Sequence, residues 1–168
     1  KAGFEAHDIH MQDLLEQKKD LNQFNGLAVC GGFSYGDVLG AGKGWSSTIN
    51  FSDSIQEKFL KFFEDEQKFT LGVCNGCQML SSIKEIIPGT DSWPSFQKNH
   101  SDQFEARLSQ VKILKSKSVL LSGMEDWSLP IIVSHGEGRA SFENEDEINK
   151  LFDSEKICMT FVDSSGYQ

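Results

Sequence analysis

The first half of the chain alternates short apolar runs that lead into glycine with amphipathic segments. Residues 26–32 form an apolar run that opens into glycines, and residues 69–71 form a second run before Gly72. Runs of this length are typical of parallel strands that feed loops at their carboxyl ends. Each run is followed by a segment in which apolar side chains recur at helical spacing. The order strand, helix, strand, helix predicts a parallel sheet with right-handed crossovers.

Two helices are expected in this half. The first begins with Asp53 as N-cap and Gln56 as its capping-box partner, and the second follows the Cys74 region and stops at Pro88-Gly89. Residues 6–10 are expected to form a strand near the start of the chain. The apolar faces consist of Ile55, Phe59, Phe62 and Phe63 in the first helix, and Met79, Leu80, Ile83, Ile86 and Ile87 in the second.

After Pro88 the pattern changes to alternation. Residues 104–108 alternate apolar and polar side chains, and residues 111–113 resume the alternation one step out of phase, which predicts an antiparallel element with a bulge or turn at residues 109–110. The remaining elements are expected to be a buried strand at 131–133, a helix with an acidic first turn that runs through Phe152, and a strand at 157–162. The fold class is therefore α/β, with a mostly parallel sheet flanked by helices and an antiparallel element added after residue 95.

Composition narrows the class of protein. The chain has 168 residues, which suits one domain, and its 25 acidic and 16 basic residues give a formal net charge of −9. This charge argues against nucleic acid or an anionic membrane as a partner. No apolar run could span a bilayer and no signal-peptide pattern occurs, so a soluble, cytoplasmic protein is expected. The 4 cysteines do not make a disulfide scaffold.

The segment Gly72-Val73-Cys74-Asn75-Gly76 carries the strongest chemical signal. It places Cys74 between two glycines where a strand is expected to pass into a helix. A G-x-S-x-G turn exposes its nucleophile on a sharp bend of this kind, and here cysteine replaces serine. The positive end of the helix dipole favours a thiolate, and the backbone N–H of Asn75 can donate to an oxyanion. A second N–H can come from the glycine loop at residues 31–37 if the strand before it lies beside the Cys74 strand.

Other interpretations of Cys74 remain open at this point. A cysteine in such a turn can be a small buried apolar residue. Cys74 and Cys77 also form a C-x-x-C, which fits a thioredoxin-like redox dithiol. A zinc site is not expected, because Cys30 and Cys158 stand alone and the histidines show no paired ligand spacing. A domain that keeps the fold as a non-catalytic interaction scaffold is a further alternative.

Several long motifs resemble one enzyme family. Residues 30–42, 72–78, 93–94, 101–107 and 134–139 are similar to the glutaminase domains of the phosphoribosylformylglycinamidine synthases, within the class I (triad) glutamine amidotransferases. The resemblance runs through essentially the whole chain. Cys77 and the run Gly42-Lys43-Gly44-Trp45 are more similar to the large, single-chain form of the enzyme than to the small separate subunit.

The resemblance implies a flavodoxin-like amidotransferase fold and a reaction in two places. Cys74 is expected to attack the side-chain amide of glutamine and form a thioester, with the backbone N–H groups of Asn75 and of Gly32-Phe33 around the oxyanion. Gln78 is expected either to shape the glutamine pocket or to serve in plain packing. Ammonia is then expected to pass to a synthetase domain of the same parent chain. That domain uses ATP and Mg²⁺ to convert formylglycinamide ribonucleotide into formylglycinamidine ribonucleotide in purine biosynthesis. No cofactor or metal is expected within these residues.

The general base is the missing part of this constellation. The family uses a His-Pro-Glu motif, which does not occur here. His135-Gly136-Glu137 has the spacing of a substitute, but in the resemblance it matches an internal loop that precedes the catalytic motif. His7, His10 and His100 are expected at the surface. The chain is therefore expected to be truncated at both ends, part of a larger multidomain protein, and inactive by itself.

Overall fold

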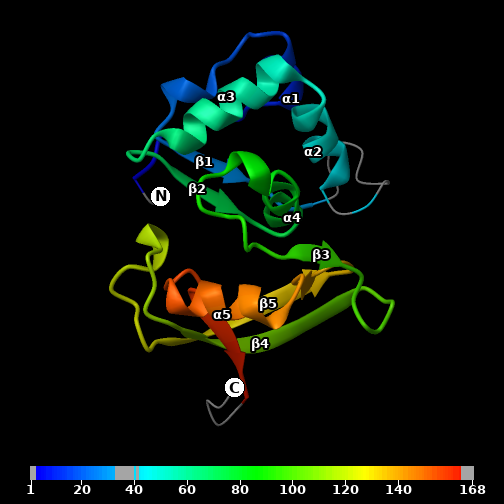
Figure 1. Cartoon of the computed structure of the whole chain (residues 1–168), viewed down its shortest axis with the longest axis vertical. Coiled ribbons are helices and arrows are strands. Elements are labelled where there is room, and N and C mark those ends of the chain that lie inside the picture. The colour runs from blue at the N-terminus through cyan, green and yellow to red at the C-terminus, as the bar shows by residue number, and fades with distance from the viewer. Residues whose placement is uncertain (1–2, 33–39, 41, 164–168) are drawn as a thin grey trace. The chain divides into compact units, whose positions relative to one another are not determined.

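The structure is a computed structural model that describes residues 3–32, 40 and 42–163. Its first part is built around two parallel strands (Figure 1). Strand β1 (Gly26–Val29) pairs in parallel with β2 (Phe69–Gly72), and the register sets Val29 opposite Gly72. The prediction of neighbouring parallel strands is confirmed. Because both strands end at the same edge of the pair, the segments that follow Val29 and Gly72 emerge side by side.

Helices pack around this pair. They are α1 (Met11–Leu15), α2 (Lys43–Asn50), α3 (Asp53–Glu64) and α4 (Asn75–Ser82), with short 3₁₀ helices η1 (Leu21–Gln23) and η3 (Lys84–Ile86). Helix α4 contacts β2, and α2 contacts both α3 and α4 (Figure 1). The prediction of a strand at residues 6–10 is wrong, because the chain has no regular secondary structure there before α1 begins. Helix α2 was not predicted.

Helix α3 confirms the predicted apolar face. Ile55, Phe59 and Phe62 are buried in the core, where each side chain removed from water contributes about 1.5–3 kcal/mol. The predicted capping box is wrong, because the N-cap is Ser52 and Asp53 is already the first helical residue. Ser52 makes no side-chain capping bond, and its carbonyl accepts from the Gln56 N–H at 2.8 Å.

The second predicted helix is shorter than expected. Helix α4 ends at Ser82, and the 3₁₀ helix η3 follows it in place of a continuous α-helix to Pro88. Ile83 leaves helical geometry, with φ −115° and ψ 21°, while its N–H donates to Leu80 at 3.2 Å in the tighter three-residue pattern. Ile83 is nevertheless buried, so the apolar pattern marks the core beyond the end of the helix.

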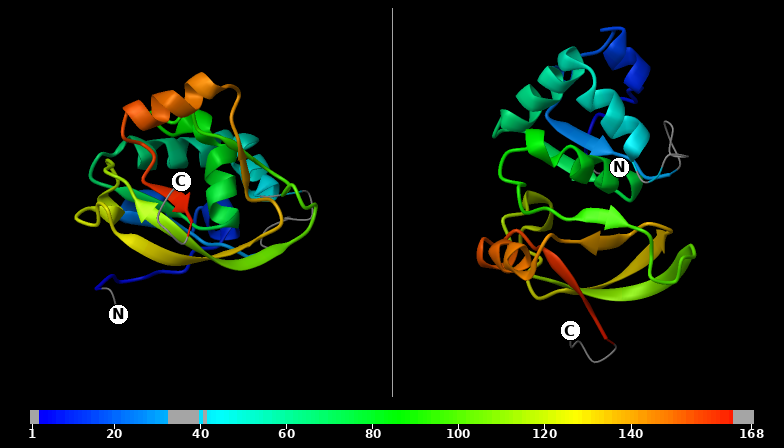
Figure 2. Two further views of the ribbon diagram at one scale, coloured as in Figure 1. Left: turned by 90° about the horizontal axis from the view of Figure 1, so that it is seen from below. Right: turned by 45° about the vertical axis from the view of Figure 1, so that its right-hand side comes forward.

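Residues 89–168 form a second compact unit, separate from residues 1–88. Its sheet has the order β5-β4-β7, and a second pair joins β3 to β6. Figure 2 shows β4 and β5 as two long curved strands side by side. The elements are β3 (Ser95–Gln97), β4 (Glu105–Ile113), the 3₁₀ helix η4 (Val119–Leu121), β5 (Ser128–His135), β6 (Arg139–Ser141), α5 (Glu145–Asp153) and β7 (Met159–Val162).

The antiparallel element expected after residue 95 is confirmed, because β4 pairs antiparallel with both β5 and β7. The parallel part is smaller than predicted. Among the described residues β1–β2 is the one parallel pairing, so the expectation of a mostly parallel sheet is too strong for this chain. Helix α5 confirms the predicted acidic first turn, and its N-cap Asn144 accepts from the Glu147 N–H at 3.1 Å.

The bulge expected at residues 109–110 is wrong. The β4–β5 register runs without a break from Glu105 opposite His135 to Lys112 opposite Ser128. The change of phase reflects two faces of one strand, since Val111 is buried on one face while Leu108 is 73% exposed on the other. The prediction that the strand at residues 131–133 is buried holds only at Val133, because Ile132 is 80% exposed.

Candidate active site

Cys74 occupies a strained turn between β2 and α4. It is the N-cap of α4, and its backbone has φ 51° and ψ −114°, a positive φ that non-glycine residues rarely adopt. Strain of this kind costs about 1–3 kcal/mol and concentrates at functional sites. The turn is closed by hydrogen bonds from the Gly76 N–H to Val73 at 2.9 Å and from the Gln78 N–H to Cys74 at 3.1 Å. The result is an exposed thiol at the amino end of a helix, as the sequence predicted.

Two glycines allow the backbone to approach this turn closely. A Cβ added to Gly76 would lie 2.1 Å from the carbonyl oxygen of Val29, so α4 begins directly against the end of β1. A Cβ added to Gly31 would lie 2.9 Å from Cys74 Cβ and 3.8 Å from its sulfur. Any side chain at either position would displace the turn. The structure therefore brings the predicted glycine loop and the predicted nucleophile together.

The described part of the predicted oxyanion and glutamine site also includes Asn75, Gly32 and Gln78. Asn75 is the first residue of α4, and the first N–H groups of a helix have no acceptor within it. Gly32 follows Gly31 with φ 104°, a left-handed conformation suited to glycine. Phe33 lies outside the described residues. Gln78 is buried in α4 one turn after Cys74.

Cys77 differs from Cys74 in its surroundings. It is only partly exposed, and burial raises the pKa of its thiol, with a further increase from the neighbouring Cys74. A redox dithiol needs a readily ionised thiol only at its attacking cysteine, so the raised pKa of Cys77 does not decide against the C-x-x-C interpretation. No disulfide joins any of the cysteines, all of which are among the described residues.

His135 belongs to the second unit and is held by Asn99. The Asn99 Nδ2 donates to the carbonyls of His135 at 2.9 Å and Gln103 at 3.0 Å, so its Oδ1 faces the imidazole Nδ1 at 3.0 Å and the Gly138 N–H at 3.2 Å. Because Oδ1 only accepts, Nδ1 carries the ring proton. The ring also packs on Gly138, where a Cβ would lie 2.2 Å from His135 Cε1. No sequence spacing indicates this clamp, since 36 residues separate its two side chains.

The other histidines lie at the surface, as expected. His7, His10 and His100 are exposed, and His7 Nε2 lies 3.1 Å from Glu5 Oε1. Over residues 3–32, 40 and 42–163, no group of three or more His, Cys, Asp or Glu side chains is arranged to hold a metal ion. Within the same residues, no helix is both long enough and apolar enough to cross a membrane.

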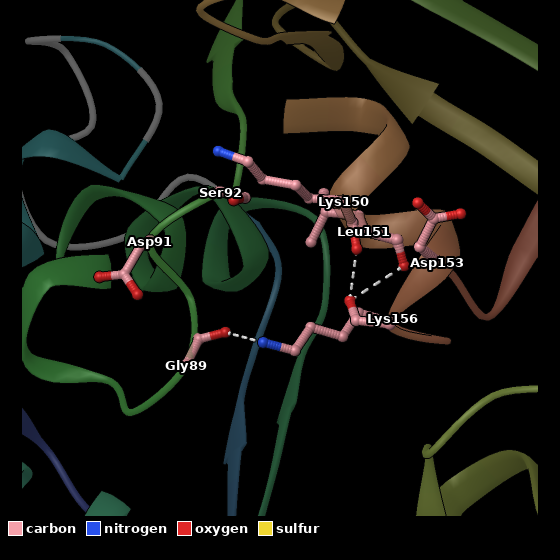
Figure 3. A pocket seen from close by; sticks show the side chains of 8 residues that line it. Gly89, Asp91, Ser92, Lys150, Leu151, Asp153 and Lys156 are labelled. Atoms are coloured by element: carbon pink, nitrogen blue, oxygen red, sulfur yellow. Dashed lines mark hydrogen bonds between the residues drawn. The ribbon is translucent and has the colours of Figure 1, made fainter. Parts of the chain in front are cut away.

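A shallow cavity in the second unit contains none of the predicted site residues. Its volume is about 410 Å³. Figure 3 shows the Lys156 side chain extended to Gly89, whose carbonyl accepts from Lys156 Nζ. The lining consists of Gly89, Asp91, Ser92, Lys150, Leu151, Asp153, Ser154 and Lys156. With one lysine engaged by a carbonyl and carboxylates close by, the cavity has no consistent charge that would select a ligand.

Comparison with known families decides the class of protein. Over residues 1–168 the chain matches the sequence model of the CobB/CobQ-like glutamine amidotransferase domain. The chain belongs to this family. The amidotransferase predicted from the Cys74 motif and its companions is therefore confirmed, and glutamine is the substrate that this class of domain hydrolyses.

The fold of this amidotransferase domain is similar to a solved structure, that of PurLQS from Thermotoga maritima. The two share 20% sequence identity with a TM-score of 0.65, and the alignment covers 87% of this chain and 59% of that chain. The likeness confirms the amidotransferase-like α/β fold. This chain therefore spans about three fifths of the length of the chain that it matches.

Proposed function

We propose that this amidotransferase domain is the glutaminase part of a phosphoribosylformylglycinamidine synthase. The family match, the fold shared with PurLQS and the long motifs around residues 30–42, 72–78 and 134–139 support the proposal. The observation that carries it is the Cys74 turn, in which an exposed thiol at a helix N-terminus faces the Gly31 loop from a parallel neighbouring strand. A strand-to-helix turn of this geometry presents a nucleophile.

In the proposed reaction the Cys74 thiolate attacks the side-chain carbonyl carbon of glutamine. The tetrahedral oxyanion is stabilised by the N–H groups of Asn75 and of the Gly32-Phe33 segment, each of which typically contributes about a hundredfold or more to rate. The carbon–nitrogen bond then breaks, the nitrogen takes a proton and leaves as ammonia, and a thioester remains. Water hydrolyses the thioester to glutamate and restores the thiol. Gln78 lines the glutamine pocket in this proposal.

Ammonia released in this way serves a synthetase part of the same parent protein. The synthetase uses ATP and Mg²⁺ to convert formylglycinamide ribonucleotide into formylglycinamidine ribonucleotide, so neither ATP nor the metal binds within these residues. This division of labour separates two measurable activities. One depends on glutamine and the other accepts ammonia directly.

The test uses the intact protein that carries this chain. Cys74→Ala should abolish glutamine-dependent synthesis and leave ammonia-dependent synthesis near the wild-type rate, because the thiol is needed only to release ammonia. Cys77→Ser is the matched control and should retain most of both activities. Equal loss of both activities in Cys74→Ala would contradict the division of labour. Unchanged glutamine-dependent synthesis would make the chain a non-catalytic interaction domain.

A variant of His135 tests which residue acts as the general base of this reaction. His135→Asn keeps an N–H that can donate to Asn99 Oδ1, but it lacks the Nε2 atom that would exchange protons with substrate. We propose that the base belongs to a His-Pro-Glu motif of the parent protein, so this variant should keep most of the glutamine-dependent rate. A loss of a thousandfold or more, with folding intact, would assign the base to His135 and Glu137.

A further inference from the structure

Asn75 is a polar residue buried without hydrogen bonds. Its side chain is 2% exposed, and neither Nδ2 nor Oδ1 has a hydrogen-bond partner within the described part of the chain. A buried carboxamide normally has partners for both its donor and its acceptor, because leaving them unpaired costs their desolvation. A leucine, which has the same branched shape but a larger volume, would avoid that cost. The structure therefore accepts a loss of stability at this position.

A second buried asparagine shows the usual arrangement. Asn99 is 6% exposed, and its side chain makes hydrogen bonds with Gln103, Gly138 and both the carbonyl and the ring of His135. An asparagine side chain can thus be buried in this protein with its polar atoms hydrogen-bonded. The absence of hydrogen bonds at Asn75 therefore results from where this residue lies in the fold.

That position is the peptide next to the nucleophile. Asn75 follows Cys74 directly, and its own N–H is the proposed oxyanion donor. The backbone on either side is confined, because Gly31 lies against Cys74 and Gly76 lies against the Val29 carbonyl. A bond made by the Asn75 carboxamide would therefore act on the orientation of the Cys74–Asn75 peptide. Few other side chains could affect that N–H so directly.

We propose that Asn75 is a positioning residue of the glutaminase step. Its carboxamide gains hydrogen-bond partners as glutamine is converted to the tetrahedral intermediate on Cys74, and these bonds orient the Asn75 N–H toward the developing oxyanion. The unbound protein then carries the cost of an unpaired carboxamide, and the transition state recovers it. This inference rests on the proposed glutaminase function and adds a role for the Asn75 side chain to that of its backbone. Losses of stability that serve catalysis are a common property of active sites.

The first test compares the same substitution at both buried asparagines of the chain. Asn75→Leu should raise Tm by about 2–4 °C, because it removes two unpaired polar atoms. Asn99→Leu should lower Tm, because it leaves the His135 ring and the Gly138 N–H without their acceptor. A lower Tm or loss of folding in Asn75→Leu would show that the carboxamide is bonded in the unbound protein and would overturn the proposal.

The second test measures glutamine-dependent synthesis by the intact protein. In Asn75→Leu and in the smaller Asn75→Ala, kcat should fall about tenfold or more while KM for glutamine changes less than about threefold, since the lost interaction acts in the transition state. Ammonia-dependent synthesis serves as the control rate. An unchanged kcat in both variants would overturn the role of Asn75, provided that Cys74→Ala abolishes the activity. Survival of the activity in Cys74→Ala would instead contradict the proposed function itself.

Discussion

The Cys74 turn depends on the absence of a Cβ atom at Gly31 and at Gly76. Both lack a Cβ where one would collide, but they meet different partners. Gly76 lies against the Val29 carbonyl, which belongs to the sheet, whereas Gly31 lies against Cys74, which belongs to the site. A methyl group at Gly31 would therefore act on Cys74 directly, whereas one at Gly76 would act first on the packing of α4 against the end of β1.

Gly31→Ala should reduce glutamine-dependent activity at least tenfold with a modest change in Tm. The added methyl carbon would lie 2.9 Å from Cys74 Cβ, so the exposed thiol would have to move. Misplacement of a reacting atom by about 1 Å can cost a hundredfold in rate. Steady-state kinetics of the intact protein and thermal unfolding of the chain measure the two effects.

The control for Gly31→Ala is Gly76→Ala, in which the new carbon would lie 2.1 Å from the Val29 carbonyl oxygen. This overpacking should lower the free energy of unfolding by about 3 kcal/mol. Wild-type activity in Gly31→Ala would show that the loop does not lie against the thiol.

Cys77 should react more slowly than Cys74 with iodoacetamide. The raised pKa of Cys77 lowers its thiolate fraction at any given pH, and only the thiolate reacts. Labelling at Cys77 should therefore increase as the pH rises above the ordinary thiol range. Peptide mass spectrometry after timed alkylation reports each site separately. Equal rates at pH 8 would contradict the raised pKa of Cys77.

At the scale of elements, the short 3₁₀ helix η1 depends on one carboxylate. The Asp20 side chain accepts from the Asn22 N–H at 3.0 Å and from Asn22 Nδ2 at 3.1 Å. The backbone hydrogen bond is the main cause that lowers the pKa of Asp20. Because the folded pKa lies below the unfolded one, this bond stabilises the protein above the unfolded pKa and is lost as pH falls through the folded value.

Asp20→Ala should therefore lower Tm at neutral pH and have little effect in strong acid. The expected cost at neutral pH is about 1 kcal/mol, typical of a lost capping acceptor. Asp20→Asn keeps a neutral acceptor and should show a smaller loss without the same pH dependence. Thermal unfolding of the three proteins between pH 2 and 7 makes the comparison. A constant difference between wild type and Asp20→Ala at all pH values would contradict the assignment.

At the scale of the whole chain, each unit contains its own core. Residues 1–88 bury apolar side chains from α2, α3 and α4, and residues 89–168 bury Val111, Ile113 and Val133 on one face of the β5-β4-β7 sheet. The opposite face of that sheet is apolar and exposed at the cross-strand pair Leu108 and Ile132. Exposed apolar pairs on a sheet favour self-association.

Replacing both Leu108 and Ile132 with threonine should reduce self-association without loss of stability. Threonine suits strands, and neither side chain is buried, so the free energy of unfolding should change by less than about 0.5 kcal/mol. Light scattering and urea denaturation of the chain measure the two quantities. A loss of several kcal/mol would show that this face is covered in solution.

Much of the site could be predicted from sequence because its signals are local. The glycines around Cys74, the apolar run before it and the helical pattern after it lie within about twenty residues, and each reflects a steric or periodic requirement of one turn. The pairing of β1 with β2 was also predictable, since two apolar runs separated by a helix form a parallel unit. Some errors lie at element ends, as at Ser52 and Ile83, where side-chain type and backbone geometry are only loosely linked. Others concern whole elements, since the strand expected at residues 6–10 is absent and helix α2 was not predicted.

By itself the sequence determined the strand-to-helix turn at Cys74 and the amidotransferase class, because these depend on residue type at fixed local spacing. Only the tertiary structure decided which polar groups are satisfied. Asn75 and Asn99 are the same residue, yet one is buried without a partner and the other clamps His135 across 36 residues. Likewise, the alternation in β4 gave no indication of which face is buried, since that depends on what packs against the sheet. Hydrogen bonds and burial are made between segments distant in sequence, and local pattern does not contain them.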